Sequence, residues 1–367
     1  MKKRILFLLP SIGVKPIGGF KVVYEYANRL AADGFEVNII YPAYCARIGQ
    51  NLLLAFLRRC KAVWRYALNY FTKDYACSWF KIDSRVHELW TWSLAEKFVP
   101  KADFYIATSI NTSVYLNNYK HIPVDHKFYL IQGFENWNGI TDEQVIKTYH
   151  YPMHKIAIAH WLGDIVHKTG ESYSVIPNGF DFNYFRKRID ISSRNHFIVC
   201  MLYHRAEVKG CTDGFAALEI VKKKYPSLQV NIFGVPTRPE QLPDWYHYYQ
   251  TPDRDTHNRI YNESAIFIGT SWKEGWGLTI GEAMICGCAV ACTDNSGYLE
   301  MAIPNVTALI SPVQNPEALA ANIIRLIEDD KLRYRIAEAG HQNIQRFSWE
   351  KSYEKLKDLL LTRETQC

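Results

Sequence analysis

Two glutamates, Glu274 and Glu282, are separated by seven intervening residues that include three glycines. We expect the first in a loop that follows a strand, and the second about one turn inside the next helix. Such a loop offers backbone N–H groups to an anion at a helix N-terminus, whereas carboxylates accept hydrogen bonds from hydroxyls. The pair therefore suits a diphosphate with a polyol on each side, as in a nucleotide sugar. A capped helix with ordinary surface glutamates is the alternative.

Two cations, Arg205 and Lys209, follow the strand predicted at 197–202. Ligands of parallel sheets bind beyond the carboxyl ends of the strands, so both side chains are expected to point into the same site as Glu274. An arginine fork and a lysine point charge can neutralise the charge that develops on a diphosphate leaving group. Solvated cations at a strand end are the alternative.

The elements that must position these residues alternate between strand and helix. Ile5–Leu9 is entirely apolar, as expected of a strand covered on both faces. A loop with Gly18-Gly19 and a helix ended by Gly34 lead to a second strand, Val37–Tyr41. Further strands are expected at 102–108, 127–131, 155–159, 197–202, 229–233, 265–269 and 289–292, and helices at 214–224, 278–286, 316–328 and 331–345. The pattern predicts two parallel α/β domains with a cleft between them.

The chain has 367 residues, a length that suits two domains rather than one. Val175–Gly179 contains a proline and an Asn-Gly pair, which favour a stiff turn at a domain junction. We therefore expect domains at 1–177 and 178–348.

The net charge of +6 comes from one segment. Val37–Lys73 has six basic residues and no acidic one, and the rest of the chain has 37 of each. A nucleic-acid-binding protein would be basic more broadly, so no nucleic-acid partner is expected.

Residues 51–71 within this segment form an amphipathic pattern. One stripe is apolar and comprises Leu53, Phe56, Leu57, Cys60, Val63, Trp64, Ala67, Leu68 and Phe71, and the other comprises Arg58, Lys61, Arg65 and Asn69. Basic amphipathic helices are typical of anionic membrane surfaces. A helix packed on the domain, with a solvated basic face, fits the same pattern.

The compartment is expected to be cytoplasmic. Nine cysteines are too few for a disulfide framework in a chain of this length. The apolar run after Lys2-Lys3-Arg4 has five residues before Pro10, which favours a strand over a signal peptide. No run of about 18 apolar residues occurs, so no membrane span is expected.

The chain resembles the retaining GT-B glycosyltransferases of family 4, the glycosyl transferases group 1. The matching segments are Gly18-Gly19, Val175–Asp181, Lys209-Gly210, Glu274–Met284, Cys286-Gly287, Thr293-Asp294, Gly297–Glu300 and Thr307–Leu309. The resemblance covers most of the chain and is strongest over 197–350. It implies two Rossmann-like domains, the first binding the acceptor and the second the nucleotide sugar. It also implies that a last helix, 349–367, returns to the first domain.

The resemblance also implies a role for each matching residue. Glu274 would bind donor-sugar hydroxyls and Glu282 the ribose, while Arg205 and Lys209 would hold the diphosphate. The remaining donor contacts would be Gly18 and Gly19, the backbone N–H groups of Trp276, Gly277, Leu278 and Thr279, and, for the base, Gly234 and Val235. No metal and no separate cofactor is implied, and UDP is favoured only by its frequency among similar proteins.

Two departures from the family pattern concern catalysis. Lys209 follows Arg205 by four positions rather than five, and His204 precedes the arginine, which puts the role of Arg205 in doubt. The histidine that relatives often place after a strand of the first domain is not evident. Glu135, in the corresponding stretch, could orient or activate an acceptor hydroxyl, and a surface carboxylate is the alternative.

The predicted activity is transfer of a hexose from a nucleotide diphosphate sugar to a saccharide or lipid-linked saccharide, with retention. The expected context is bacterial surface polysaccharide synthesis at the inner face of the membrane. Three other interpretations rest on single features of the sequence or fold. Asp253-Arg254-Asp255 matches a D-x-D metal motif, but Asp253 also suits a helix cap. A nicotinamide-dependent oxidoreductase would need G-x-G-x-x-G, which is absent. A non-catalytic sugar-binding protein on the same fold stays open.

Overall fold

The structure is a computed structural model that describes residues 2–137 and 139–362. The chain forms two compact units. The first comprises Met1–Asn178 and Glu350–Cys367, and the second comprises Gly179–Trp349. The boundaries expected from the sequence, after residues 177 and 348, each lie one residue from this division.

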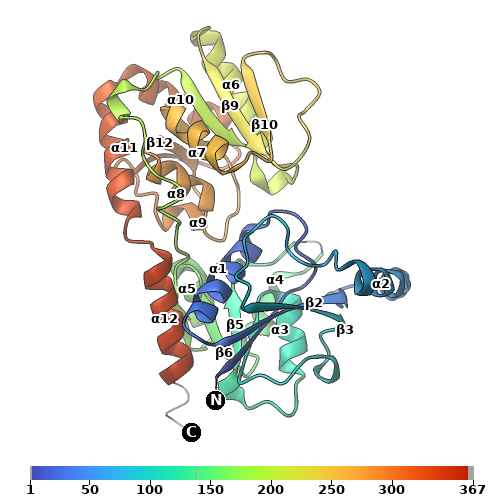
Figure 1. Cartoon of the computed structure of the whole chain (residues 1–367). Helices are drawn as coiled ribbons and strands as arrows, with labels where there is room; N and C mark the ends of the chain where they lie inside the picture. The colour runs from blue at the N-terminus through green and yellow to red at the C-terminus, as the bar shows by residue number, and fades with distance from the viewer. Residues whose placement is uncertain (1, 138, 363–367) are drawn as a thin grey trace. The chain divides into compact units, whose positions relative to one another are not determined.

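Unit 1 is built on a seven-stranded parallel sheet with the order β3-β2-β1-β4-β5-β6-β7 (Figure 1). The strands are β1 (Arg4–Leu8), β2 (Glu36–Tyr44), β3 (Val86–Ser93), β4 (Phe104–Ala107), β5 (Lys127–Ile131), β6 (His154–Ala157) and β7 (Tyr173–Val175). Phe7 of β1 pairs with Ile39 on one side and with Ile106 on the other, and all three are buried. The central strands are mainly apolar because helices cover both of their faces.

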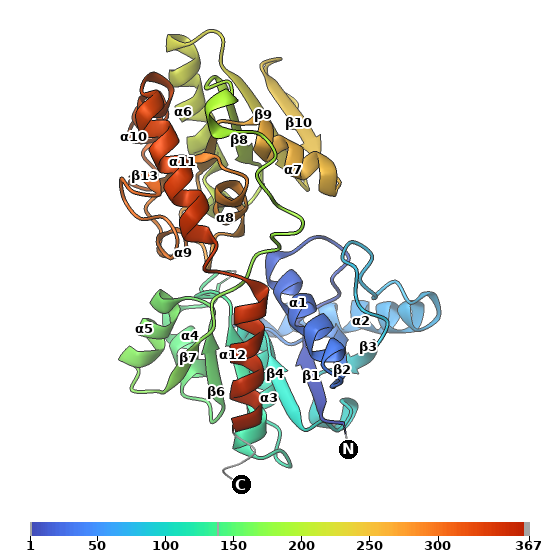
Figure 2. The ribbon, with the colours of Figure 1, turned by 60° about the vertical axis from the view of Figure 1, so that its left-hand side comes forward.

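The helices of unit 1 are α1 (Gly18–Ala32), α2 (Leu52–Thr72), α3 (Ile110–Asn117), α4 (Asp142–Tyr149), α5 (His160–Lys168) and α12 (Trp349–Thr362). The C-terminal helix α12 packs beside α1 (Figure 2), where Tyr353 and Lys357 each donate a hydrogen bond to Asp33. Ser352 adds a bond to the carbonyl of Pro177. The chain therefore enters unit 2 and comes back to complete unit 1.

The helix predicted at 51–71 is present as α2, but its exposed face is the apolar one. All nine residues of the predicted apolar stripe are exposed, whereas Arg58 and Arg65 are half-buried and Asn69 is buried. The interpretation of a helix packed on the domain through its apolar stripe is therefore wrong. No helix in the described part of the chain is long and apolar enough to cross a bilayer.

Unit 2 is built on a six-stranded parallel sheet with the order β10-β9-β8-β11-β12-β13. Its strands are β8 (Ile198–Leu202), β9 (Gln229–Gly234), β10 (Tyr246–Gln250), β11 (Ile266–Gly269), β12 (Ala289–Thr293) and β13 (Ala308–Ser311). Its helices are α6 (Cys211–Lys224), α7 (Arg254–Glu263), α8 (Leu278–Ile285), α9 (Ser296–Leu299), α10 (Pro316–Glu328) and α11 (Asp330–Ile344).

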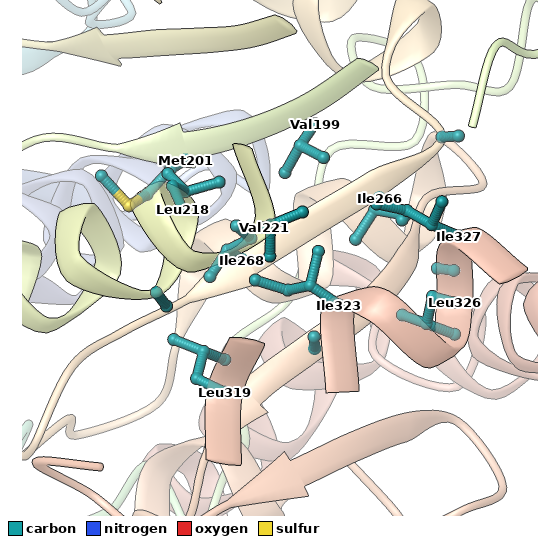
Figure 3. Packing of buried hydrophobic residues seen from close by; sticks show 14 of the residues in the cluster. Val199, Met201, Leu218, Val221, Ile266, Ile268, Leu319, Ile323, Leu326 and Ile327 are labelled. Carbon is teal, nitrogen blue, oxygen red and sulfur yellow. The ribbon is translucent and has the colours of Figure 1, made fainter. Parts of the chain in front are cut away.

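The core of unit 2 lies where α6 and α10 pack on the sheet (Figure 3). Leu218 and Val221 of α6 and Ile323 of α10 belong to one buried cluster with Val199 of β8 and Ile268 of β11. This core fixes β8 and β11 side by side, so the loops that follow these two strands leave the sheet at neighbouring points.

Candidate functional site

The site in unit 2 lies at the switch point of its sheet. From β8 the chain moves outward through β9 to β10, and on the other side of β8 it places β11, β12 and β13. Loops diverge at such a point and leave room for a ligand beyond the carboxyl ends of the strands. Lys209 follows β8 and Glu274 follows β11, so the topology brings together two residues that are far apart in sequence.

The side chains of Lys209 and Glu274 meet in an ion pair. The ammonium of Lys209 lies 2.6 Å from Oε1 of Glu274, and both groups are partly shielded from solvent. The hydroxyl of Ser271 donates a second hydrogen bond to the same carboxylate oxygen, at 2.8 Å. One oxygen of Glu274 therefore has two donors, and neither of these contacts uses its other oxygen.

Close backbone packing holds the two loops in place. A side chain at Gly210 would meet the carbonyl oxygen of Thr270 at 2.1 Å, and the Thr270 hydroxyl donates to the carbonyl of Lys209. A side chain at Gly297 would likewise meet the carbonyl oxygen of Glu274 at 2.4 Å. Glycine is therefore required at both positions, and the separation between Lys209 and Glu274 is set by the backbone.

The segment before α8 has the predicted helix N-terminus. Gly277 is its N-cap with φ +96°, a conformation that strains other residues, and it makes no side-chain capping bond. Leu278 and Thr279 form the first turn, whose N–H groups have no partner within the helix. Trp276 is buried, and its indole packs edge-on against Phe347, 5.0 Å between ring centroids. Its side chain thus anchors the loop within the unit.

Glu282 lies in α8, inside the helix as predicted. It is only 5% exposed, and its carboxylate accepts a hydrogen bond from the hydroxyl of Tyr261 on α7. A buried carboxylate needs such donors because burial without hydrogen bonds is costly. Glu282 is therefore a built feature of the unit rather than an ordinary surface glutamate.

Arg205 lies apart from the ion pair. Its guanidinium donates to the hydroxyl of Thr237 at 2.7 Å, beyond the end of β9. Gly234, the last residue of β9, packs so tightly that a side chain there would meet the carbonyl of Tyr203 at 2.3 Å. Val235 follows and is partly exposed. In the structure Arg205 is therefore hydrogen-bonded to a residue after β9 and takes no part in the Lys209–Glu274 ion pair, and its expected contact with a diphosphate stays a prediction.

The predicted residues of unit 1 also lie at carboxyl ends of strands. The sequence predicts Gly18 and Gly19 in the loop after β1. This prediction is wrong, because both residues form the first turn of α1. A side chain at Gly19 would press on the amide of Gln132, which follows β5, at 3.2 Å. The Gln132 amide donates to the carbonyl of Thr108, while its oxygen is buried and has no hydrogen-bond partner among the residues that the structure describes. No sequence pattern marks Gln132, because a glutamine at a strand end is common.

Glu135 is not a simple surface carboxylate. Its Oε1 accepts a hydrogen bond from the backbone N–H of Ile110, the first residue of α3, at 3.0 Å. Burial nevertheless raises the pKa of Glu135 to about 8, because this one bond does not offset the desolvation of the charged form. The group is therefore largely protonated at pH 7, and it can take up and release a proton close to neutral pH.

The acidic pair of the D-x-D match is engaged in local structure. Asp253 is the N-cap of α7 and accepts the N–H of Thr256 at 2.8 Å, as its alternative interpretation predicts. Asp255 lies 3.2 Å from the guanidinium of Arg188. Within residues 2–137 and 139–362, no group of three or more histidine, cysteine or acidic side chains has an arrangement that could hold a metal ion.

Several residues of the site were assigned no role from the sequence, although Thr293 lies in one of the segments that match the family. Ser271 binds Glu274 directly, and Thr293 and Asn295 both donate to the carbonyl of Ser271. Ser271 lies three residues before Glu274, so that spacing is the one local hint. Thr293 and Asn295 come from β12 and the start of α9, and only the fold brings them to the loop.

Comparison with known proteins places this geometry in context. Residues 185–343 match the model of the family described as glycosyl transferases group 1. The chain is 31% identical over 107 residues to an O-antigen chain mannosyltransferase B of Escherichia coli, covering 29% of this chain and 27% of that protein. It is 26% identical over 188 residues to a phosphatidyl-myo-inositol mannosyltransferase of Mycobacterium tuberculosis, covering 47% and 50%. These matches span between about a quarter and half of the curated relatives' length.

Solved structures match over nearly the whole length. A sucrose-phosphate synthase from Thermosynechococcus elongatus superposes with a TM-score of 0.72 at 15% identity, covering all of both chains. The Anabaena protein HepE, crystallised with UDP-glucose, gives 0.71 at 17% identity, covering 98% of this chain and 99% of that one. At these identities the likeness establishes the architecture alone.

Proposed function

We propose that this chain transfers a sugar from a nucleotide diphosphate donor to an acceptor hydroxyl. The match of residues 185–343 to the glycosyl transferases group 1 and the GT-B fold of the chain support this proposal. The observation that carries the proposal is the Lys209–Glu274 pair at the switch point of unit 2. The cation of this pair and the N–H groups in the first turn of α8 can bind the diphosphate of a nucleotide sugar. The carboxylate can bind the hydroxyls of its sugar. An ordinary capped helix would not require the glycines at 210, 277 and 297.

The roles within unit 2 follow from charge. Lys209 would turn from Glu274 to the diphosphate, where it would stabilise the charge that develops on the leaving group. Glu274 would then accept hydrogen bonds from sugar hydroxyls, held in place by Ser271. The N–H groups at Trp276, Gly277, Leu278 and Thr279 would bind phosphate and sugar oxygens. Donor binding would thus replace the Lys209–Glu274 ion pair. Lys209 would contact the anionic diphosphate, and Glu274 would contact sugar hydroxyls that donate to it.

The remaining donor contacts would lie at the edges of that site. Glu282 would bind the ribose, and Gly234 with Val235 would contact the base. We propose that Arg205 acts near Thr237 on this nucleotide side, because its guanidinium lies there in the structure. UDP is the donor nucleotide that we propose, supported by the likeness to a fold crystallised with UDP-glucose.

The acceptor side would be formed by unit 1. Beyond the carboxyl ends of two of its strands lie Gly18 and Gly19, which follow β1, and Glu135, which follows β5. The raised pKa of Glu135 suits a group that orients or activates a hydroxyl. We propose a hexose donor, retention at the anomeric carbon, no metal or cofactor, and a saccharide or lipid-linked acceptor. The setting would be bacterial surface polysaccharide synthesis, with the enzyme at the inner face of the membrane. Relatives named as O-antigen and phosphatidyl-inositol mannosyltransferases support this acceptor class.

A non-catalytic sugar-binding protein is the second candidate, and turnover separates it from an enzyme. Glu274→Gln keeps the size of the side chain and one accepting oxygen, but it replaces the other oxygen with an amide that donates, and it removes the charge. We expect it to lower kcat/KM with a UDP-hexose by at least about a hundredfold, as for the loss of a charge-assisted contact in the transition state. NMR of the product would report the anomeric configuration.

Donor binding is measured separately by thermal shift with UDP-, GDP-, dTDP- and ADP-sugars. A donor at a hundredfold excess over Kd stabilises the folded protein by about 2.7 kcal/mol. Glu263→Gln, at an exposed helical position paired with Arg259, is the matched control and should change neither readout. Stabilisation by a donor without turnover would favour the sugar-binding protein, and wild-type turnover in Glu274→Gln would exclude the proposed role of that residue.

A further inference from the structure

The outward face of α2 carries an unusual density of large apolar side chains. Trp64 is 80% exposed and Phe71 is 82% exposed, and Leu53, Phe56 and Leu57 each have more than half of their surface in solvent. At 100° per residue, the nine exposed residues of the apolar stripe cover an arc of about 140°. Figures 1 and 2 show α2 at the outer edge of unit 1, beyond β2 and β3. A continuous apolar patch of this kind marks an interaction surface.

The opposite face of α2 holds the helix to unit 1. Ala62 and Asn69 are buried, and Arg65 donates to the carbonyl of Ala43 on β2. Arg58 donates to the side chain of Gln50 at 3.0 Å. The indole of Trp90 on β3 donates to the carbonyl of Tyr66 at 3.1 Å. These contacts fix the rotation of the helix and leave the apolar stripe facing outward.

Cations flank the apolar stripe on both edges. Arg59 and Lys61 are exposed and lie just outside the stripe, one on each side of it. The chain from Val37 to Lys73 has no acidic residue that could pair with them. The surface therefore presents an apolar centre with a positive rim.

Two kinds of partner could cover the apolar stripe of α2, a second copy of the helix or a lipid bilayer. The cations beside the stripe distinguish between them. In a dimer of two α2 helices, the rims of two copies would bring like charges together with no carboxylate between them. The apolar arc is also wider than the narrow seam of a two-stranded coiled coil. An anionic bilayer instead offers hydrocarbon for the stripe and phosphates for the rim.

We infer that α2 lies in the plane of an anionic lipid bilayer, with its apolar stripe inserted among the acyl chains and Arg59 and Lys61 at the headgroups. With 21 residues the helix extends about 30 Å along the surface. Trp64, Tyr70 and Phe71 supply the aromatic side chains that favour the interface. The inference deepens the proposed function by naming its membrane partner, and rests on that function only for the lipid-linked acceptor.

The surface that we infer to contact lipid is thus the apolar stripe of α2, and not the stripe that contains Arg58 and Arg65. Arg58 and Arg65 contact unit 1, so their substitution would test the packing of α2 rather than its contact with lipid. The contribution of the stripe also makes binding only partly sensitive to salt, because apolar insertion is not screened.

The test is sedimentation of the full-length protein with vesicles of phosphatidylglycerol and phosphatidylcholine, and with phosphatidylcholine alone. The variant Leu57→Gln/Trp64→Gln/Phe71→Gln keeps good helix formers at exposed positions, so the fold is expected to persist. We expect its partition onto anionic vesicles to fall by at least about tenfold. Arg59→Gln/Lys61→Gln should weaken binding to anionic vesicles several-fold and leave binding to neutral vesicles unchanged.

Ile303→Gln/Val306→Gln is the matched control, because it removes exposed apolar side chains from unit 2. It should sediment like the wild type. Equal partition of wild type and triple variant, or no sedimentation of the wild type, would overturn the inference. A wild-type dimer that the triple variant dissociates, without vesicle binding, would assign the surface to a second copy instead. Thermal shift with the donor on the same variants keeps failure of the membrane contact distinct from failure of the proposed activity.

Discussion

At the scale of single residues, the two central carboxylates of the proposed reaction are held in opposite ways. Glu274 accepts hydrogen bonds from a cation and a hydroxyl on the same oxygen. Glu135 is half-buried and accepts one backbone N–H, and desolvation raises its pKa to about 8. The first arrangement suits a group that binds by accepting hydrogen bonds, and the second suits a group that exchanges a proton.

The raised pKa of Glu135 has a consequence for stability. In the unfolded chain the group loses its proton near pH 4.5, and in the folded protein near pH 8. Stability is therefore lost as the pH rises between these values, because folding must take up a proton. Glu135→Gln stays neutral and can still accept the Ile110 N–H. We expect the variant to exceed the wild type by at least about 1 kcal/mol at pH 8, and to match it at pH 4.

Thermal melts of both proteins across that range measure the difference. Glu143→Gln, in the first turn of α4, is the control for a general effect of removing one carboxylate from unit 1. A difference between Glu135→Gln and the wild type that does not change with pH would contradict the assigned pKa.

At the scale of elements, sequence patterns predict best where one physical requirement dominates. β1, β8, β11 and β12 are short apolar runs between turn signals, and each is a central strand. The edge strand β3 has the sequence VHELWTWS and β10 has YHYYQ, and their polar and aromatic mixture gives no clear period. The Glu274 loop and α8 were predictable from glycine positions. The rotation of α2 was not, because it depends on Ala43 and Trp90, which are distant in sequence.

The N-terminus of α8 gives a prediction about an element. Gly277 has φ +96°, and a methyl group there would meet the ring of Tyr298 at 2.6 Å. Gly277→Ala should therefore combine backbone strain with a steric clash and destabilise unit 2 by about 2–4 kcal/mol. Gly170→Ala is the matched control, because Gly170 has φ +82° and open space around it, so strain alone remains, about 1 kcal/mol.

Denaturant melts, with hydrogen exchange to assign each change to a unit, would separate the two costs. We also expect Gly277→Ala to weaken donor binding, since the first turn of α8 must move to relieve the clash. Equal destabilisation by the two substitutions would mean that Tyr298 gives way easily and that the loop is not held as tightly as the contact suggests.

At the scale of the whole molecule, the order of the elements along the chain does not match their distribution between the two units. α12 follows unit 2 in sequence but belongs to unit 1, where Leu360 is fully buried. Leu360→Ala should therefore leave a cavity in unit 1 and cost about 2–5 kcal/mol there. Leu326→Ala, at an equally buried position of α10 in unit 2, is the matched variant. Each should increase exchange mainly in its own unit.

Hydrogen exchange of peptides from β1 and from β12 would distinguish these outcomes, because the two strands are central to different sheets. We expect Leu360→Ala to speed exchange in β1 and Leu326→Ala to speed it in β12, while a bound donor protects β12 in wild type and in Leu360→Ala alike. Equal acceleration in both strands by either substitution would mean that the two units unfold as one. Donor binding would then draw on the stability of the whole chain, and α12 would couple unit 1 to unit 2 rather than complete unit 1 alone.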